Sequence, residues 1–148
     1  MNPLKIRKAT TNDAPSIAQL SGQLGYPVET LVMRDRLTRF LKLEEHAVFV
    51  AETSDVLGWI HAAEHELLEV GNHCEIWGLV VAGGQRGKGV GRRLIEAVEE
   101  WARDRGLDEV TVRSNVIRPE SHPFYERLGF TRYKTQHAYR KGLALPQS

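Results

Sequence analysis

The stretch QRGKGVGRRL, residues 85–94, alternates three glycines with basic side chains. It follows the apolar run EIWGLVVA, residues 75–82, and precedes apolar residues that recur with helical spacing from Leu94 onward. This order predicts a strand, a tight turn and the N-terminus of a helix. Glycine lets the backbone approach a ligand closely, and the N–H groups at a helix N-terminus attract anions. Because cations at that end are unfavourable by roughly 0.3–1 kcal/mol each, the four basic residues indicate an anionic ligand.

The glycine turn matches neither of the two common nucleotide-binding motifs. A Walker loop needs Gly, four residues and then Gly-Lys-Ser/Thr, but Gly87-Lys88 is followed by another glycine, and Ala82 stands where the first glycine is required. The dinucleotide fingerprint G-x-G-x-x-G fails because Arg92 or Leu94 occupies its last position. For the turn taken alone, a plain β-to-α connection with solvated arginines remains an alternative.

The composition is typical of a soluble globular domain. The chain has 148 residues, of which 41% are hydrophobic and 26% charged, and its formal net charge is +1. No apolar run approaches the roughly 20 residues of a membrane helix, the N-terminus lacks the apolar core of a signal peptide, and the single Cys74 cannot form an internal disulfide. We therefore expect one cytoplasmic domain over residues 1–148, frayed from about residue 142, with no membrane or nucleic-acid partner and with homodimerisation left open.

Turn signals and apolar periodicity divide the chain into strands and helices. Strands are expected at about 4–9, 46–52, 56–68, 74–82 and 109–115, and in one or two closing segments within 130–143. Helices are expected at about 10–24, 28–43, 91–105 and 118–128. The resulting order, β-α-α-β-β-β-α-β-α-β-β, predicts an α/β (α+β) fold with a mixed central sheet flanked by helices on both faces.

The segment EIWGLVVAGGQRGKGVGRRLI resembles the acyl-CoA motif of the GNAT superfamily of N-acetyltransferases. The family signature R/Q-x-x-G-x-G/A is met by Arg86, Gly89 and Gly91, and HPFYERLGF is similar to the second signature, a tyrosine followed by Gly-Phe. The element order also looks like the family, so the resemblance covers residues 4–141 and implies a single GNAT-like domain. One departure is Gly83, which stands where many members have proline.

The resemblance implies an acetyl-CoA-dependent N-acetyltransferase, with acetyl-CoA as co-substrate, no metal and direct attack in a ternary complex. The pyrophosphate would lie on N–H groups of the glycine turn. The pantetheine arm would pair with the edge of a strand that splays open at a bulge, and the N–H groups of that edge would polarise the thioester carbonyl. The implied contacts are Leu79, Val80, Val81, Arg86, Gly87, Lys88, Gly89, Val90, Gly91, Arg92 and Asn115. The spacing from Asn115 to Tyr125 is longer than in many members.

Acetyl transfer needs a neutral amine, whereas a lysine-like amine has a pKa of about 10.4. Glu75, at the start of the expected strand, occupies the position of the general-base glutamate in the histone-type members that this segment resembles; a surface ion pair is the alternative. Glu64 and Glu66 are further candidate bases. Tyr125 is the candidate acid, because a phenol can protonate the departing CoA thiolate. The alternative for Tyr125 is a packed core aromatic.

Three histidines raise the question of a metal. His61 and His65 lie four residues apart on one expected strand and therefore share a face, with His73 near them on the next strand. The spacing of a known zinc motif is missing, so we predict no metal site.

The identity of the acceptor substrate is what the sequence constrains least. In the family that the chain resembles, the first two helices and the later strand junctions shape the acceptor pocket. The corresponding segments here are residues 21–30 with Tyr26, residues 59–66 and the C-terminal residues 135–143. These acidic and aromatic residues favour a small cationic amine, such as a polyamine or an aminoglycoside-like compound. A protein N-terminus or lysine fits nearly as well. Alternatives from other classes are a non-catalytic CoA-binding module and a nucleic-acid-binding protein.

Overall fold

The computed structural model describes residues 2–85, 87–113 and 121–146. These fall into two compact units, residues 1–113 and 114–148. The first unit contains β1 (Lys5–Lys8), α1 (Ala14–Gln23), α2 (Thr30–Leu41), β2 (His46–Glu52), β3 (Val56–Leu67), β4 (Gly71–Val81), α3 (Val90–Asp104) and β5 (Val110–Val112), with 3-10 turns η1 (Thr11–Asp13) and η2 (Gly83–Gln85). The second unit contains α4 (Ser121–Arg127).

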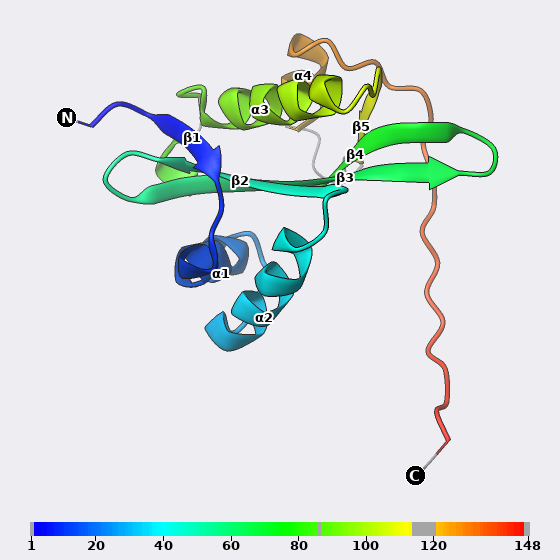
Figure 1. The fold of residues 1–148 in the computed structure, drawn as a ribbon, viewed down its shortest axis with the longest axis horizontal. Coiled ribbons are helices and arrows are strands. Elements are labelled where there is room, and N and C mark those ends of the chain that lie inside the picture. The colour runs from blue at the N-terminus through cyan, green and yellow to red at the C-terminus, as the bar shows by residue number, and fades with distance from the viewer. Residues whose placement is uncertain (1, 86, 114–120, 147–148) are drawn as a thin grey trace. The chain divides into compact units, whose positions relative to one another are not determined.

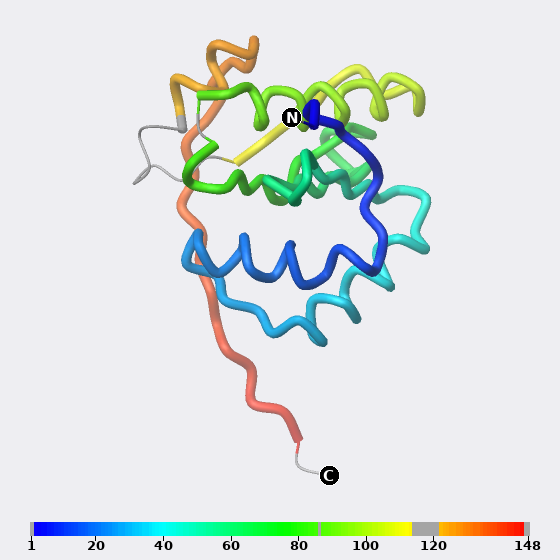
Figure 2. The backbone as a smooth tube through the Cα atoms, turned by 90° about the vertical axis from the view of Figure 1, so that its left-hand side faces the viewer, coloured from blue at the N-terminus to red at the C-terminus, as the bar shows by residue number. Residues whose placement is uncertain are grey.

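The sheet of the first unit has five strands in the order β1-β2-β3-β4-β5. The first four pair antiparallel, and β5 pairs parallel to β4. Helices α1 and α2 cover one face and α3 covers the other, as Figures 1 and 2 show from two directions. The predicted mixed sheet is confirmed, and its parallel pair, β4 and β5, is connected through the glycine turn and α3. No helix among the described residues has the length and apolar character needed to cross a bilayer.

Each face of the sheet buries its own apolar cluster. On one face, Leu94, Ile95 and Val98 of α3 are almost completely buried. On the other face, Ile17 of α1 and Leu37 of α2 join a cluster that includes residues of β2 and the partly buried Trp59. Burial of side chains of this size stabilises a fold by roughly 1.5–3 kcal/mol each. Both faces of the central strands are therefore fixed by packing.

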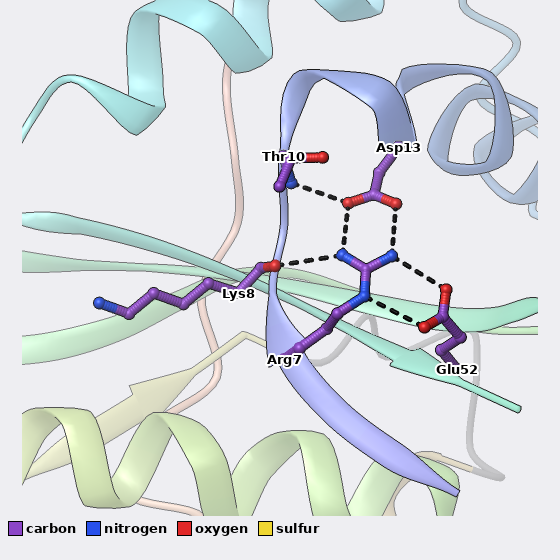
Figure 3. A network of polar contacts seen from close by, with 5 residues as sticks. All are labelled: Arg7, Lys8, Thr10, Asp13 and Glu52. Carbon is purple, nitrogen blue, oxygen red and sulfur yellow. Dashed lines mark hydrogen bonds and ion pairs between the residues drawn. The ribbon is translucent and has the colours of Figure 1, made fainter.

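A charged network joins β1 to η1 and β2 (Figure 3). The guanidinium of Arg7 donates to both carboxylate oxygens of Asp13, at 2.9 and 2.8 Å, and to both oxygens of Glu52, at 3.2 and 3.0 Å. The backbone N–H of Thr10 donates to Asp13 at 2.7 Å. Burial alone raises the pKa of Asp13, but hydrogen bonds from Arg7 and Thr10 outweigh it, so the pKa lies below its usual value. This network therefore ties the end of β1 both to η1, which precedes α1, and to β2.

Two parts of the predicted fold need correction. Strand β4 begins at Gly71, three residues before the predicted start, because Leu67 pairs with Gly71 and extends the hairpin with β3 beyond the apolar run. The closing strands predicted within 130–143 are absent, since residues 130–146 contain no strand and residues 131–146 are exposed. The aromatic residues and threonines of this segment favour a strand, but a strand forms only by hydrogen bonding to a neighbour.

Candidate active site

Strand β4 carries a bulge at its centre. In the β3–β4 register, Trp77 is the extra residue, between the pair His61–Gly78 and the pair Ala62–Ile76. A bulge bends its strand and changes the face to which the following side chains point. The bulge expected from the family resemblance therefore lies at Trp77.

Beyond the bulge, β4 keeps β3 as a neighbour but loses β5. The parallel pairs join Cys74–Ile76 to Val110–Val112 and go no further, whereas pairing with β3 continues to Val81. In the described part of the chain, residues 78–81 thus have no strand on the β5 side. Alternate backbone N–H and C=O groups of this segment face an open edge.

The glycine turn connects that open edge to α3. Gly87 and Gly89 have φ values of 78° and 82°, and Gly89 is the N-cap of α3. Such angles favour glycine, whereas an added Cβ at either position would meet nothing within 4 Å. No side chain caps α3, so the N–H groups of its first turn have no partner within the helix. The turn therefore presents several backbone donors together.

The basic residues of the turn differ in their contacts. Lys88 is exposed and makes no ion pair in the part of the chain that the structure describes. The Arg92 Nε lies 3.9 Å from the Glu96 Oε1 at the surface, a pair of little energetic value. Arg93 donates instead to the Leu4 carbonyl at 3.1 Å. Lys88 and Arg92 are therefore available to an anion on the turn; Arg86 lies outside the described residues.

Glu75 lies in the interior of β4, not at its start as the sequence suggested. Its side chain is only 13% exposed, and its Oε1 lies 3.4 Å from the Arg113 Nε. A pocket of about 370 Å³ is lined by His65, Glu75, Ile76, Trp77 and Arg113. The sequence left two alternatives for Glu75, a general base or a surface ion pair. In the structure Glu75 makes an ion pair and also lines a pocket, where a base could act.

The other two candidate carboxylates are placed differently. Glu64 accepts hydrogen bonds from Asn72, at 2.9 Å, and Arg105, at 2.8 Å. These two bonds lower the pKa of Glu64. Glu66, opposite Asn72 on β4, is exposed. Neither carboxylate lines the pocket that contains Glu75.

Imidazole and aromatic rings from four elements gather beside this pocket. The His46 Nδ1 and the His61 Nε2 lie 3.0 Å apart, and Phe40 of α2 contacts both rings with centroid distances of 4.8 and 4.7 Å. Trp77 lies 5.3 Å from each of the two histidine rings, and His65 lies 6.4 Å from Trp77. The sequence grouped His61 and His65 correctly on one face.

Two members of this group, His46 and Trp77, were not found from the sequence. His46 lies on β2, and only the hairpin register brings it beside His61; Trp77 is displaced by a bulge that no local pattern marks. Among the described residues, no group of three or more His, Cys, Asp or Glu side chains is arranged to hold a metal ion.

The two hydrogen-bonded histidines are neutral at pH 7. Burial, and secondarily the proximity of His46, lower the pKa of His61 to about 4. Burial also lowers the pKa of His46, although Glu45 opposes this effect. Two neutral imidazoles can share one N–H···N bond, in which one ring donates and the other accepts.

Tyr125 belongs to α4 in the second unit, whereas Glu75 and the glycine turn belong to the first. Its ring contacts Phe124 and Phe130, with centroid distances of 5.2 and 5.8 Å. Burial raises the pKa of the Tyr125 hydroxyl, so the phenol stays protonated at neutral pH. Asn115 lies outside the described residues.

Known proteins resemble this chain in sequence and in fold. A model of the acetyltransferase (GNAT) family matches residues 15–130. Aminoglycoside N(6')-acetyltransferase type 1 from Stenotrophomonas maltophilia is 32% identical over 131 residues, covering 84% of each chain. Aminoalkylphosphonate N-acetyltransferase from Salmonella typhimurium is 30% identical over 136 residues, covering 90% of this chain and 86% of the relative. A solved aminoglycoside N-acetyltransferase in complex with CoA has a TM-score of 0.86 at 21% identity, covering 95% of this chain and 96% of the other, which shows a shared fold.

Proposed function

Because this chain belongs to the acetyltransferase (GNAT) family and is an N-acetyltransferase, we propose that it moves an acetyl group from acetyl-CoA to the primary amine of a small cationic molecule. The observation that supports this most strongly is the order of the features along β4 and the turn that follows it. A pocket with a carboxylate, a bulge, an open backbone edge and a glycine turn follow one another along a single segment. Two relatives that are at least 30% identical and cover more than four fifths of this chain are named for aminoglycosides and aminoalkylphosphonates, both small amines. N-alpha-acetyltransferase 30 from Schizosaccharomyces pombe is 37% identical, but over only 54 residues, or 36% of this chain.

The glycine turn and the open edge suit the two halves of CoA. The N–H groups from Gly87 to Arg92 and the side chains of Lys88 and Arg92 can hold a pyrophosphate. Leu79, Val80 and Val81 can pair with the amides of the pantetheine arm along the edge that β5 leaves open. The N–H groups of this edge can also stabilise the oxyanion that forms when an amine attacks the thioester.

Glu75 is proposed as the base that removes the proton from the acceptor ammonium, directly or through one water. Its nearly buried carboxylate lines the pocket, where the Arg113 Nε lies 3.4 Å from its Oε1. The neutral amine then attacks the acetyl carbon in a ternary complex. Glu64 is less suited to this role, because Asn72 and Arg105 already occupy its oxygens.

Tyr125 is proposed as the acid that protonates the CoA sulfur as the C–S bond breaks. Its hydroxyl keeps its proton at neutral pH, as a general acid must. A thiol with a pKa of about 8.5 leaves fairly well unaided, so the tyrosine should accelerate the reaction rather than be essential.

The test is release of free thiol from acetyl-CoA in the presence of an amine panel. The panel contains an aminoglycoside, a polyamine, an aminoalkylphosphonate and peptides with a free N-terminus or lysine. Faster thiol release with a small amine than with the peptides would support the proposal. A preference for the peptides, or CoA binding without release for any amine, would contradict it and favour a protein acetyltransferase or a non-catalytic CoA-binding module.

A further inference from the structure

Trp77 has an unusual position for a large apolar side chain. It is 48% exposed, although its neighbour Ile76 is 3% exposed. As the extra residue of the bulge it has no partner on β3, and its ring lines the pocket that contains Glu75. An exposed aromatic ring at the wall of a pocket is a candidate contact for a ligand.

The ring of Trp77 packs edge-to-face against the rings of both His46 and His61. Its plane stands at 81° to the His46 ring and at 73° to the His61 ring, with both centroids at 5.3 Å. The two imidazoles are themselves fixed by their 3.0 Å hydrogen bond and by Phe40 of α2. Contacts from β2 and β3, supported in turn by Phe40 of α2, therefore limit the orientations open to the indole.

The pocket combines this ring with the Glu75 carboxylate, which pairs at 3.4 Å with the largely exposed Arg113. The face of an indole carries negative charge density and attracts a cation within about 6 Å of the ring. The amine that reacts gives up its proton to Glu75, so at the moment of attack it has no positive charge to place on Trp77. The positive charge that fits the indole must be a second one on the same molecule.

We propose that Trp77 recognises a second cationic group of the acceptor, so that the preferred substrates are diamines or polyamines, and that His46 and His61 are positioning residues for its ring. This inference rests on the proposed function. It names the substrate class within it: an amine that carries at least one further positive charge close to the reacting nitrogen.

The experiment compares two acceptors of nearly equal size, diaminobutane and n-pentylamine, which differ in one terminal charge. We expect the protein to prefer diaminobutane by roughly 5- to 30-fold in kcat/KM, corresponding to the usual strength of a cation–π contact. Trp77→Leu should abolish the preference by raising the KM for diaminobutane, whereas Trp77→Phe, which keeps an aromatic face, should retain most of it. The KM for acetyl-CoA should stay unchanged in both variants.

The positioning pair is tested with His61→Phe, which keeps a ring against Phe40 and Trp77 but removes the hydrogen bond. We expect His61→Phe to raise the KM for diaminobutane, and so reduce the preference for it, while the kcat for n-pentylamine stays unchanged. A general loss of structure would instead lower kcat for both amines. If Trp77→Leu does not fold, Trp77→Met takes its place, because it also removes the aromatic face and should lose the preference for diaminobutane; a preference kept in Trp77→Met would overturn the role of Trp77.

The outcomes separate the two levels of the proposal. Equal turnover of both amines, or an unchanged preference in Trp77→Leu, would overturn the role of Trp77 while the acetylation of small amines stands. Turnover of neither amine, with rapid acetylation of a peptide, would overturn the small-amine function and this inference with it.

Discussion

Gly89 shows how a single residue shapes the donor site. Its φ of 82° favours glycine, and a residue with a Cβ in that conformation costs roughly 1–2 kcal/mol. Because an added Cβ would meet nothing within 4 Å, the cost is one of backbone conformation and not of collision. The turn would relax by moving the N–H groups that we propose for the pyrophosphate.

We therefore predict that Gly89→Ala weakens CoA binding at least about tenfold, by loss of a charge-assisted hydrogen bond, and lowers the free energy of unfolding by about 1 kcal/mol. Isothermal titration with CoA and urea unfolding measure the two effects. Gly84→Ala is the matched control, because Gly84 lies in the same connection without a positive φ and also has open space around it. Equal loss of affinity in both variants would argue against the role of Gly89.

At the scale of elements, the Arg7 network attaches β1 to η1 and β2. We predict that Asp13→Asn lowers the free energy of unfolding by about 2 kcal/mol at pH 7, because Asp13 is buried and hydrogen bonded to a guanidinium. The folded-state pKa of Asp13 lies below its unfolded value. Its contribution is therefore complete above the unfolded pKa of about 3.9 and is lost as the pH falls through the folded pKa.

Denaturant unfolding at pH 7 and near pH 2 checks this sign, since the difference between Asp13→Asn and the unsubstituted protein should shrink in acid. Asp35→Asn is the control: Asp35 pairs with Arg39 on the exposed surface of α2, and such pairs contribute about 0.3–0.5 kcal/mol. A difference for Asp13→Asn that is small at pH 7, or unchanged in acid, would show that the network does not stabilise the fold.

The elements of the first unit were largely predictable from the sequence because each has a strong local signal. The helical spacing of Leu94, Ile95 and Val98 and the glycine turn before them predicted α3 well. The register between strands has no such signal. The bulge at Trp77 and the approach of His46 to His61 depend on pairing between distant segments, and the pattern within one strand does not determine them.

The prediction for the closing segment was wrong because a local strand signal is present there without a neighbouring strand to pair with. Residues 130–143 include phenylalanine, tyrosine and threonine, residue types that are enriched in strands, yet strand formation depends on a partner and not on residue type alone. Local sequence therefore predicted the elements, together with Glu75 and the glycine turn as candidates, but not the ring cluster that completes the pocket.

At the scale of the whole molecule, the proposed reaction needs groups from both units, because Tyr125 belongs to the second. We predict that Tyr125→Phe lowers kcat roughly 10- to 100-fold while CoA affinity stays nearly intact, since the ring and its contacts with Phe124 and Phe130 are kept. Tyr133→Phe, at an exposed tyrosine in the same unit, is the control and should have no effect. An unchanged kcat in Tyr125→Phe would exclude the acid role.

The proposed division of β4 into an acceptor half at Trp77 and a donor half beyond it is open to one direct measurement. Initial rates with acetyl-CoA and diaminobutane varied together would be compared for the unsubstituted protein, Gly89→Ala and Trp77→Leu. We predict that Gly89→Ala raises the KM for acetyl-CoA at least about tenfold with the amine KM within about twofold, and that Trp77→Leu does the reverse. If either substitution raised both KM values equally, the two substrates would not be recognised separately, the amine at the β4 bulge and acetyl-CoA at the glycine turn that follows β4.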